Sequence, residues 1–168
     1  MGLTIEPLGK QHERGGFTCG QPELDDWFRK RAGQDERRNV ARVFVAVDDE
    51  LGVVGFYSLD AFMLTLEGLP EEIVRKLSRC DAIPAALIGR LARDEKVRRR
   101  GMGELLLADA LRRILGAVKT LAVIAIVVDA EDARAAQFYE TFGFRAFPLQ
   151  PNRLFLLASS AAAAVAMI

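Results

Sequence analysis

Three arginines stand directly before a pair of glycines in the middle of the chain: Arg98, Arg99 and Arg100 are followed by Gly101 and Gly103. An apolar, strand-like stretch precedes them and an amphipathic, helix-like stretch follows. Glycine lets the backbone approach a phosphate without a Cβ clash, and the first N–H groups of a helix have no intrahelical partner. Because arginine adds charge and bidentate donors, this spacing predicts a phosphate-binding turn at a helix N-terminus.

The same pattern excludes two common nucleotide loops. No Gly-Lys-Ser/Thr sequence follows, as a Walker A loop requires, and no third glycine stands at the offset of the Rossmann fingerprint. Taken alone, the glycine pair could also be a tight turn with a solvated basic face.

The elements that must position this turn follow from the periodicity of the apolar residues. Strands alternate with helices in the second half, so we expect an α/β fold with a mixed central sheet, flanking helices and at least one right-handed βαβ crossover. Helices are predicted at 20–32, 69–78, 101–115 and 132–144, and strands at 83–94, 120–130 and 152–158, with two more inside 39–64. The helix after the turn should place these residues in the core: Leu106, Leu107, Ala110, Leu111 and Ile114.

The chain has 168 residues, which predicts one domain over 1–168, with an N-terminal strand or loop at 1–15 and an alanine-rich tail at 159–168. The formal net charge is zero, so attraction to a polyanion must come from local patches. We find no secretion signal and no membrane-spanning segment, and expect Cys19 and Cys80 to be reduced, partly buried thiols. These features predict a cytoplasmic protein that does not bind membranes.

Two motifs carry a resemblance to a known family. Arg98-x-x-Gly101-x-Gly103 resembles the pyrophosphate loop of the GCN5-related N-acetyltransferases (GNAT), which bind acetyl-coenzyme A. One strand further on, the chain resembles that family's Asn-x-x-Ala-x-x-Phe-Tyr-x-x-x-Gly-Phe helix, with an aspartate in place of the asparagine. The matching residues are Asp132, Ala135, Phe138, Tyr139, Gly143 and Phe144. The resemblance implies a GNAT fold.

From about residue 17 to 155 the chain is also similar to the acetyltransferase toxins of bacterial toxin–antitoxin pairs. Its most specific marks are the stretches "FTCG", "LDDW" and "GRLA", whereas Arg93 stands where a small apolar residue is expected. This likeness implies an acetyl-CoA-dependent enzyme without a metal that acetylates the α-amine of aminoacyl-tRNA and blocks translation. It also implies a ribbon-helix-helix antitoxin as partner and a homodimer. Two alternatives stay open: acetylation of a small amine or a protein N-terminus, and a mainly binding role as co-repressor with the antitoxin.

The resemblance assigns the site residues as well. Tyr139 would be the general acid, because a phenol with a pKa near 10 is protonated at neutral pH. No general base is assigned, and His12 is expected at the surface. The residues implied to bind acetyl-CoA are Leu91, Ala92, Arg93, Arg98, Arg99, Arg100, Gly101, Met102, Gly103, Glu104, Asp132 and Phe138.

A tRNA substrate needs a basic surface, and two basic runs could supply it, the first at 29–42 and the second at 90–100. The candidate tRNA-binding residues are Arg29, Lys30, Arg37, Arg38, Arg42 and Arg90. The first run could equally be a solvated helix face. Arg90 could face the acceptor or form a structural salt bridge, and Trp27 and Phe28 are expected in the core.

Overall fold

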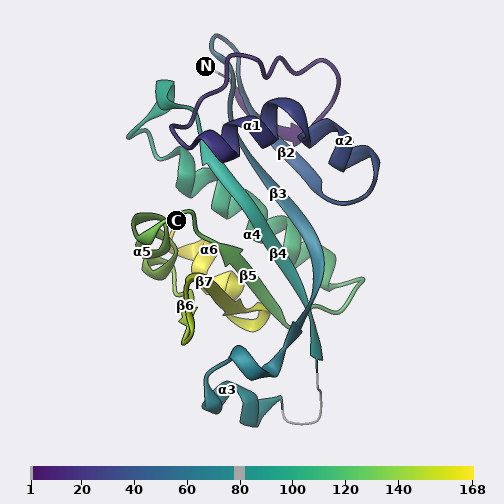
Figure 1. Ribbon diagram of the computed structural model, residues 1–168, viewed down its shortest axis with the longest axis vertical. Helices are drawn as coiled ribbons and strands as arrows, with labels where there is room; N and C mark the ends of the chain where they lie inside the picture. The colour runs from purple at the N-terminus through teal and green to yellow at the C-terminus, as the bar shows by residue number, and fades with distance from the viewer. Residues whose placement is uncertain (1, 78–81) are drawn as a thin grey trace. The chain divides into compact units, whose positions relative to one another are not determined.

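The computed structural model describes residues 2–77 and 82–168. Within them, seven strands form one mixed sheet in the order β1-β2-β3-β4-β5-β7-β6 (Figure 1). The strands are β1 (Leu3–Pro7), β2 (Arg42–Asp48), β3 (Gly52–Thr65), β4 (Ala82–Arg93), β5 (Ala125–Asp129), β6 (Arg145–Phe147) and β7 (Gln150–Leu157). The helices are α1 (Pro22–Lys30), α2 (Ala32–Arg37), α3 (Glu71–Lys76), α4 (Met102–Val118), α5 (Ala133–Thr141) and α6 (Ala161–Ala166). Short 3₁₀ turns are η1 (Leu66–Gly68), η2 (Glu95–Val97) and η3 (Ala158–Ser160).

The chain divides into two compact units, of which the first combines Met1–Asp60 with Gly89–Ala110. In this unit α1 and α2 run beside β2 (Figure 1). Its core is aromatic: the rings of Phe28 and Phe56 stack with centroids 4.1 Å apart, and Phe17 meets both edge-on. Trp27 lies in the same cluster, so the prediction that Trp27 and Phe28 are core residues is confirmed.

The second unit combines Ala61–Ile88 with Leu111–Ile168. Here β4 pairs in parallel with β5, Ala85–Ile88 against Ala125–Val128, and α4 is the connection between them. This pairing confirms the predicted βαβ crossover. The core of the unit includes Ile83, Val127 and the edge-to-face pair Phe147–Phe155, and α5 packs against β6 and β7.

The predicted helices and strands are confirmed where the structure describes them, with shifted ends. The residues expected on the core side of α4 are all buried. One boundary was wrong: β5 begins at Ala125, not near 120, because the backbone N–H groups of Thr120 and Leu121 both donate to the Ala117 carbonyl and continue the turn that ends α4. The predicted helix at 69–78 ends at Lys76, and residue 78 lies outside the described residues.

Three short elements were not predicted: α2, β6 and α6. The sequence of α2 is polar, and β6 has only three residues, so neither carries a period that a local pattern could show. The alanine-rich tail is a docked helix, since Ala161 and Ala164 are buried. The N-terminal residues supply β1, which pairs antiparallel with β2.

His12 was predicted at the surface, and this was wrong: the residue is only 9% exposed. Its Nδ1 accepts the Gly9 N–H at 2.9 Å and its Nε2 lies 2.7 Å from Glu6 Oε1, so both ring nitrogens have partners inside the fold. Cys19 is half-buried, and its Sγ lies 3.8 Å from the Gln21 carbonyl oxygen, whereas Cys80 lies outside the described residues. No helix in the described part of the chain is both long and apolar enough to cross a membrane.

Candidate active site

The turn between η2 and α4 has the backbone that its glycines predict. Gly101 has a φ of 73°, and Arg99 lies in the same left-handed region with a φ of 64°. Residues other than glycine rarely adopt this region, so the surrounding structure must hold the Arg99 backbone in it. The turn leads directly into the first N–H groups of α4, and a helix N-terminus after such a turn is an arrangement that binds phosphate.

The side chains of this turn divide by burial. Arg98, Arg99 and Arg100 are exposed, and Arg98 pairs with Glu95 at 3.4 Å between nitrogen and oxygen. Met102 is buried, so only its backbone is available to a ligand. Gly103 and Glu104 are half-buried in the first turn of α4. The turn therefore offers backbone donors in its interior and cationic side chains at its rim.

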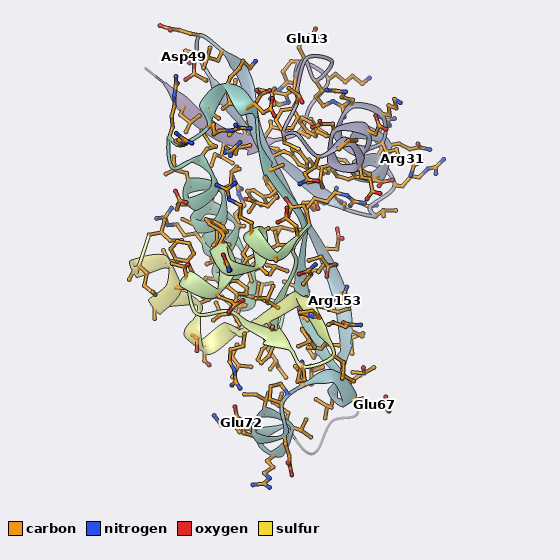
Figure 2. The ribbon with its side chains drawn as sticks, turned by 60° about the vertical axis from the view of Figure 1, so that its left-hand side comes forward. Glu13, Arg31, Asp49, Glu67, Glu72 and Arg153 are labelled. Atoms are coloured by element: carbon orange, nitrogen blue, oxygen red, sulfur yellow. The ribbon has the colours of Figure 1, made fainter. Side chains whose placement is uncertain are left out.

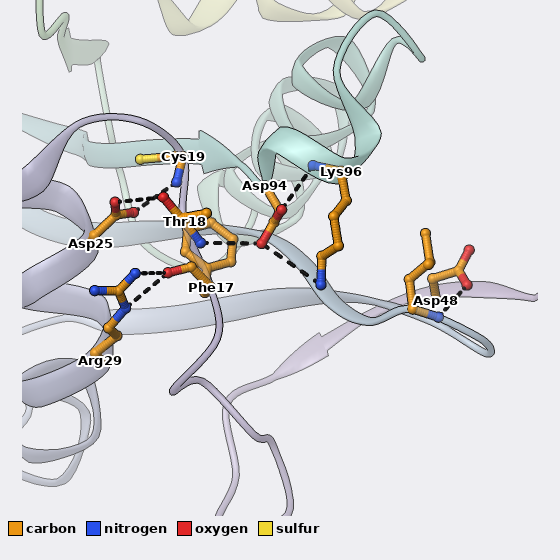
Figure 3. Close-up of polar contacts among 9 residues, drawn as sticks. Phe17, Thr18, Cys19, Asp25, Arg29, Asp48, Asp94 and Lys96 are labelled. Atoms are coloured by element: carbon orange, nitrogen blue, oxygen red, sulfur yellow. Dashed lines mark hydrogen bonds and ion pairs between the residues drawn. The ribbon is translucent and has the colours of Figure 1, made fainter.

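A buried carboxylate that the sequence reasoning missed holds this turn in place. Asp94 is fully buried at the end of β4, and its side chain accepts the Lys96 N–H at 2.8 Å and the Thr18 N–H at 3.1 Å (Figure 3). The Thr18 carbonyl in turn accepts the Glu95 N–H at 2.9 Å. The local signal was present, since aspartate is a preferred cap residue, but the partner lies 76 residues away.

The Phe17–Gly20 segment is anchored a second time by Asp25, which is buried on α1. Its carboxylate accepts the Cys19 N–H at 2.8 Å and the Thr18 hydroxyl at 3.2 Å (Figure 3). An added Cβ at Gly20 would lie 2.9 Å from Glu95 Oε1. The N-terminal segment and the turn before α4 are thus one hydrogen-bonded assembly.

We expect Asp94→Asn to lower the free energy of unfolding by about 1–3 kcal/mol, because an amide NH₂ would face a backbone N–H and leave it unsatisfied. The displaced turn should also raise the KM for acetyl-CoA several-fold while kcat changes less. Asp48→Asn is the matched control, since Asp48 also accepts two backbone N–H groups, in the β2–β3 turn. Urea unfolding and initial rates test both; equal KM values in the two variants would contradict a positioning role for Asp94.

The end of β4 carries Leu91, Ala92 and Arg93. The β4–β5 pairing covers only Ala85–Ile88, and β4 continues to Arg93. Ala92 is buried, and its two neighbours are half-buried. A contact between this stretch and acetyl-CoA stays a prediction.

Arg90 stacks on an aromatic ring, and its contact with the acceptor stays a prediction. Its guanidinium stacks over the Trp27 ring at 3.9 Å, and the indole N–H of Trp27 donates to Asp35 at 2.9 Å. Burial lowers the pKa of Arg90, while the carboxylates of Asp60 and Asp35 oppose that change. Asp60 Oδ1 is buried and has no hydrogen-bond partner among residues 2–77 and 82–168, and burial raises the pKa of this carboxyl. Arg90 is therefore a stacked cation within a cluster of charges.

The first basic run separates into two groups. Arg29 donates to the Phe17 carbonyl, with Nε at 2.8 Å, and Arg42 pairs with Glu36 and Asn39, so both hold the fold together. Lys30, Arg37 and Arg38 are exposed instead. They share an open hollow with Arg14, a residue outside the predicted run.

In the second unit, Tyr139 lies on α5 and is only 3% exposed. Its ring meets Phe138 and Phe144 edge-on, with centroids 5.3 and 5.7 Å away. Burial raises the pKa of the Tyr139 phenol, and the carboxylates of Glu131 and Asp129 raise it further. The phenol therefore keeps its proton at neutral and mildly alkaline pH, as a general acid must.

The start of α5 is fixed by Asp132, which the sequence placed in the cofactor site. Its carboxylate accepts the Ala135 N–H at 2.9 Å and so caps the helix. Gly143, with a φ of 96°, follows the helix end as predicted. Phe138 is half-buried between Tyr139 and Phe142. Among the described residues, no group of three His, Cys, Asp or Glu side chains could hold a metal ion.

Comparison with known proteins agrees with these motifs. The acetyltransferase (GNAT) domain family matches residues 39–146. A "Probable toxin TacT" of Sinorhizobium fredii (strain NBRC 101917 / NGR234) is 32% identical over 161 residues, covering 90% of this chain and 89% of the relative. A "tRNA-acetylating toxin" of Mycobacterium tuberculosis (strain ATCC 25618 / H37Rv) is 37% identical over 149 residues, covering 89% and 88%. The crystal structure of AtaTR bound with acetyl-CoA superimposes with a TM-score of 0.83 at 25% identity, over 96% of each chain.

Proposed function

The chain belongs to the GNAT acetyltransferase family, and from that premise we propose that it is a toxin that transfers acetyl from acetyl-CoA to the α-amine of aminoacyl-tRNA. The observation that carries the substrate class is its likeness, along nine-tenths of its length, to a relative described as a tRNA-acetylating toxin. The proposal takes residues 1–168 as one acetyltransferase domain. It also places the protein in the cytoplasm, where charged tRNA is used, with an antitoxin of ribbon-helix-helix type and a second copy of the chain as partners.

The binding of acetyl-CoA is assigned to the residues that the motifs predict. The backbone from Arg98 to Glu104 would hold the diphosphate, because its left-handed turn leads into the N-terminus of α4, where the first N–H groups have no intrahelical partner. The exposed arginines would add charge at the rim. The end of β4 at Leu91, Ala92 and Arg93 would pair with the extended pantetheine arm as an added strand.

The start of α5 would contribute two of the predicted residues. The Asp132 carboxylate caps the helix and so fixes α5, and it would also contact acetyl-CoA as the motif implies. Phe138 would offer its half-exposed ring to the cofactor.

Tyr139 handles the proton on the leaving group. The neutral amine nitrogen attacks the thioester carbon, the C–S bond breaks, and the sulfur takes the phenolic proton of Tyr139. The raised pKa of Tyr139 supports this role because the proton is present before the reaction. The amine of an aminoacyl ester is less basic than that of lysine, so it can lose its own proton to water without a dedicated base.

Growth on induced expression tests the proposal directly. Wild type should arrest growth, and mass spectrometry of bulk tRNA should find acetylated aminoacyl ends; Tyr139→Phe should do neither. Arrest by both proteins without acetylation would favour a binding role. A harmless wild type with unmodified charged tRNA would refute the toxin, and a screen of small amines would then identify the acceptor.

A further inference from the structure

A basic hollow lies on the first unit. It has a volume of about 340 Å³ and is lined by Arg14, Lys30, Gly33, Gln34, Arg37 and Arg38. Four of these six residues are cationic and none is acidic. We call this surface the α1–α2 hollow, because every lining residue except Arg14 belongs to or directly follows these helices.

Two guanidinium groups converge at its centre. An added Cβ at Gly33 would lie 3.2 Å from Arg14 Nη2 and 3.3 Å from Arg37 Nη1. Arg14 is anchored there, since its Nη1 donates to the Phe28 carbonyl at 2.7 Å. Burial lowers the pKa of Arg14, and the charge of Arg37 lowers it further. Like charges this close repel unless an anion lies between them.

Three of the neighbouring cations, Arg29, Arg42 and Lys30, have other partners. Arg29 and Arg42 are bound to Phe17, Glu36 and Asn39, and Lys30 forms an exposed pair with Asp26 at 3.5 Å. Arg31, the residue between α1 and α2, points away from the ribbon (Figure 2). In the described part of the chain, no carboxylate pairs with Arg37. The hollow therefore presents unused positive charge at a fixed position.

We propose that the α1–α2 hollow binds a backbone phosphate of RNA, with Arg14 and Arg37 as its two sides. This inference rests on the proposed function, because it names where that substrate's backbone would contact the protein. An acidic peptide fits less well: peptide interfaces depend on buried apolar anchors, and Gly33 is the only lining residue without a polar side chain. Phosphate needs only the convergent donors that the hollow supplies.

Binding of deacylated tRNA, measured over a range of salt with saturating coenzyme A, tests the hollow apart from the cofactor site. Arg37→Gln should weaken binding roughly tenfold, since charge-assisted hydrogen bonds are lost. The slope of log K against log salt should become shallower by about 0.7–0.9, the value for one phosphate. Gly33→Ala keeps every charge but places a methyl group against the guanidinium groups of Arg14 and Arg37, and it should also weaken binding. Arg112→Gln removes an exposed arginine of α4 that does not line the hollow and should change neither value.

Several outcomes would overturn the proposal. If Arg37→Gln and Arg112→Gln weaken binding equally while Gly33→Ala binds like wild type, net charge and not the hollow attracts RNA. If inorganic phosphate raises the melting temperature of wild type more than that of Arg37→Gln, but tRNA binding is equal, the hollow serves free phosphate. If a polyglutamate peptide depends on Arg37 and tRNA does not, the partner is an acidic protein.

The same data separate this inference from the proposed function. Wild type that binds tRNA through the hollow but acetylates no aminoacyl-tRNA would refute the toxin activity and leave the phosphate site standing. If wild type acetylates aminoacyl-tRNA while Arg37→Gln and Gly33→Ala bind tRNA normally, the phosphate site is refuted and the toxin activity stands.

Discussion

Replacing Tyr139 by phenylalanine is expected to lower kcat for acetyl transfer by about 10²–10⁴-fold, the usual contribution of a general acid. The KM for acetyl-CoA should change little, because phenylalanine keeps the buried ring and its edge contacts with Phe138 and Phe144. Steady-state release of coenzyme A, measured with an aminoacyl RNA as acceptor, gives both constants.

The chain supplies a matched control in its second tyrosine. Tyr57 is fully buried on β3 and donates to Asp109 on α4. Tyr57→Phe should therefore lose stability in thermal unfolding without a loss of kcat beyond a few-fold. Equal losses of kcat in the two variants would contradict a chemical role for Tyr139.

The pH profile of wild type follows from the same phenol. Because its pKa is raised by burial and by nearby carboxylates, loss of the Tyr139 proton should not lower kcat up to about pH 9.5, where a free phenol near 10 would begin to ionise. The rate should rise with pH as the acceptor amine loses its proton and then stay level. An amide-linked aminoacyl RNA, which resists alkaline hydrolysis, allows the measurement; a fall in kcat between pH 8 and 9.5 would be inconsistent with this assignment.

Gly101→Ala is expected to raise the KM for acetyl-CoA by about 10–100-fold. A left-handed φ costs an alanine about 1–2 kcal/mol, and the φ of Gly101 is 73°. The new Cβ would lie 3.2 Å from Glu104 Oε2 in the first turn of α4. The Glu104 side chain can move away from the new Cβ, but the backbone strain is relieved by rotating the peptide groups of the turn, which would turn N–H donors away from the diphosphate. Calorimetric titration with acetyl-CoA measures the loss.

Gly52→Ala separates backbone strain from loss of the cofactor site. Gly52 has a φ of 79° in the β2–β3 turn, and nothing lies within 4 Å of an added Cβ. Both variants should lose comparable stability, but only Gly101→Ala should lose acetyl-CoA affinity. Unchanged affinity in Gly101→Ala would show that the turn does not hold the cofactor.

The sequence by itself determined the features that depend on local order. The spacing of Leu106, Leu107 and Leu111 predicted the buried face of α4, and the glycines predicted the turn before it, which the structure shows to be left-handed at Gly101. Helical period and glycine conformation are properties of neighbouring residues, so they can be read without knowing what packs against them. The motif around Tyr139 likewise placed this tyrosine on a helix. In the structure that helix is α5, and Tyr139 is buried on it.

Only the tertiary structure decided which charged side chains are bound to other groups of the protein. Arg29 and Arg37 look alike in the basic run, yet one is bound to the Phe17 carbonyl and the other faces Arg14. Asp94 became the anchor of the turn before α4 through Thr18, and no local pattern joins positions so far apart. The free energy of a charged side chain in a folded protein depends on its burial and on the groups that the fold brings close to it. That is why the basic run could be found from sequence, while its division into cations bound within the fold and cations that line the hollow could not.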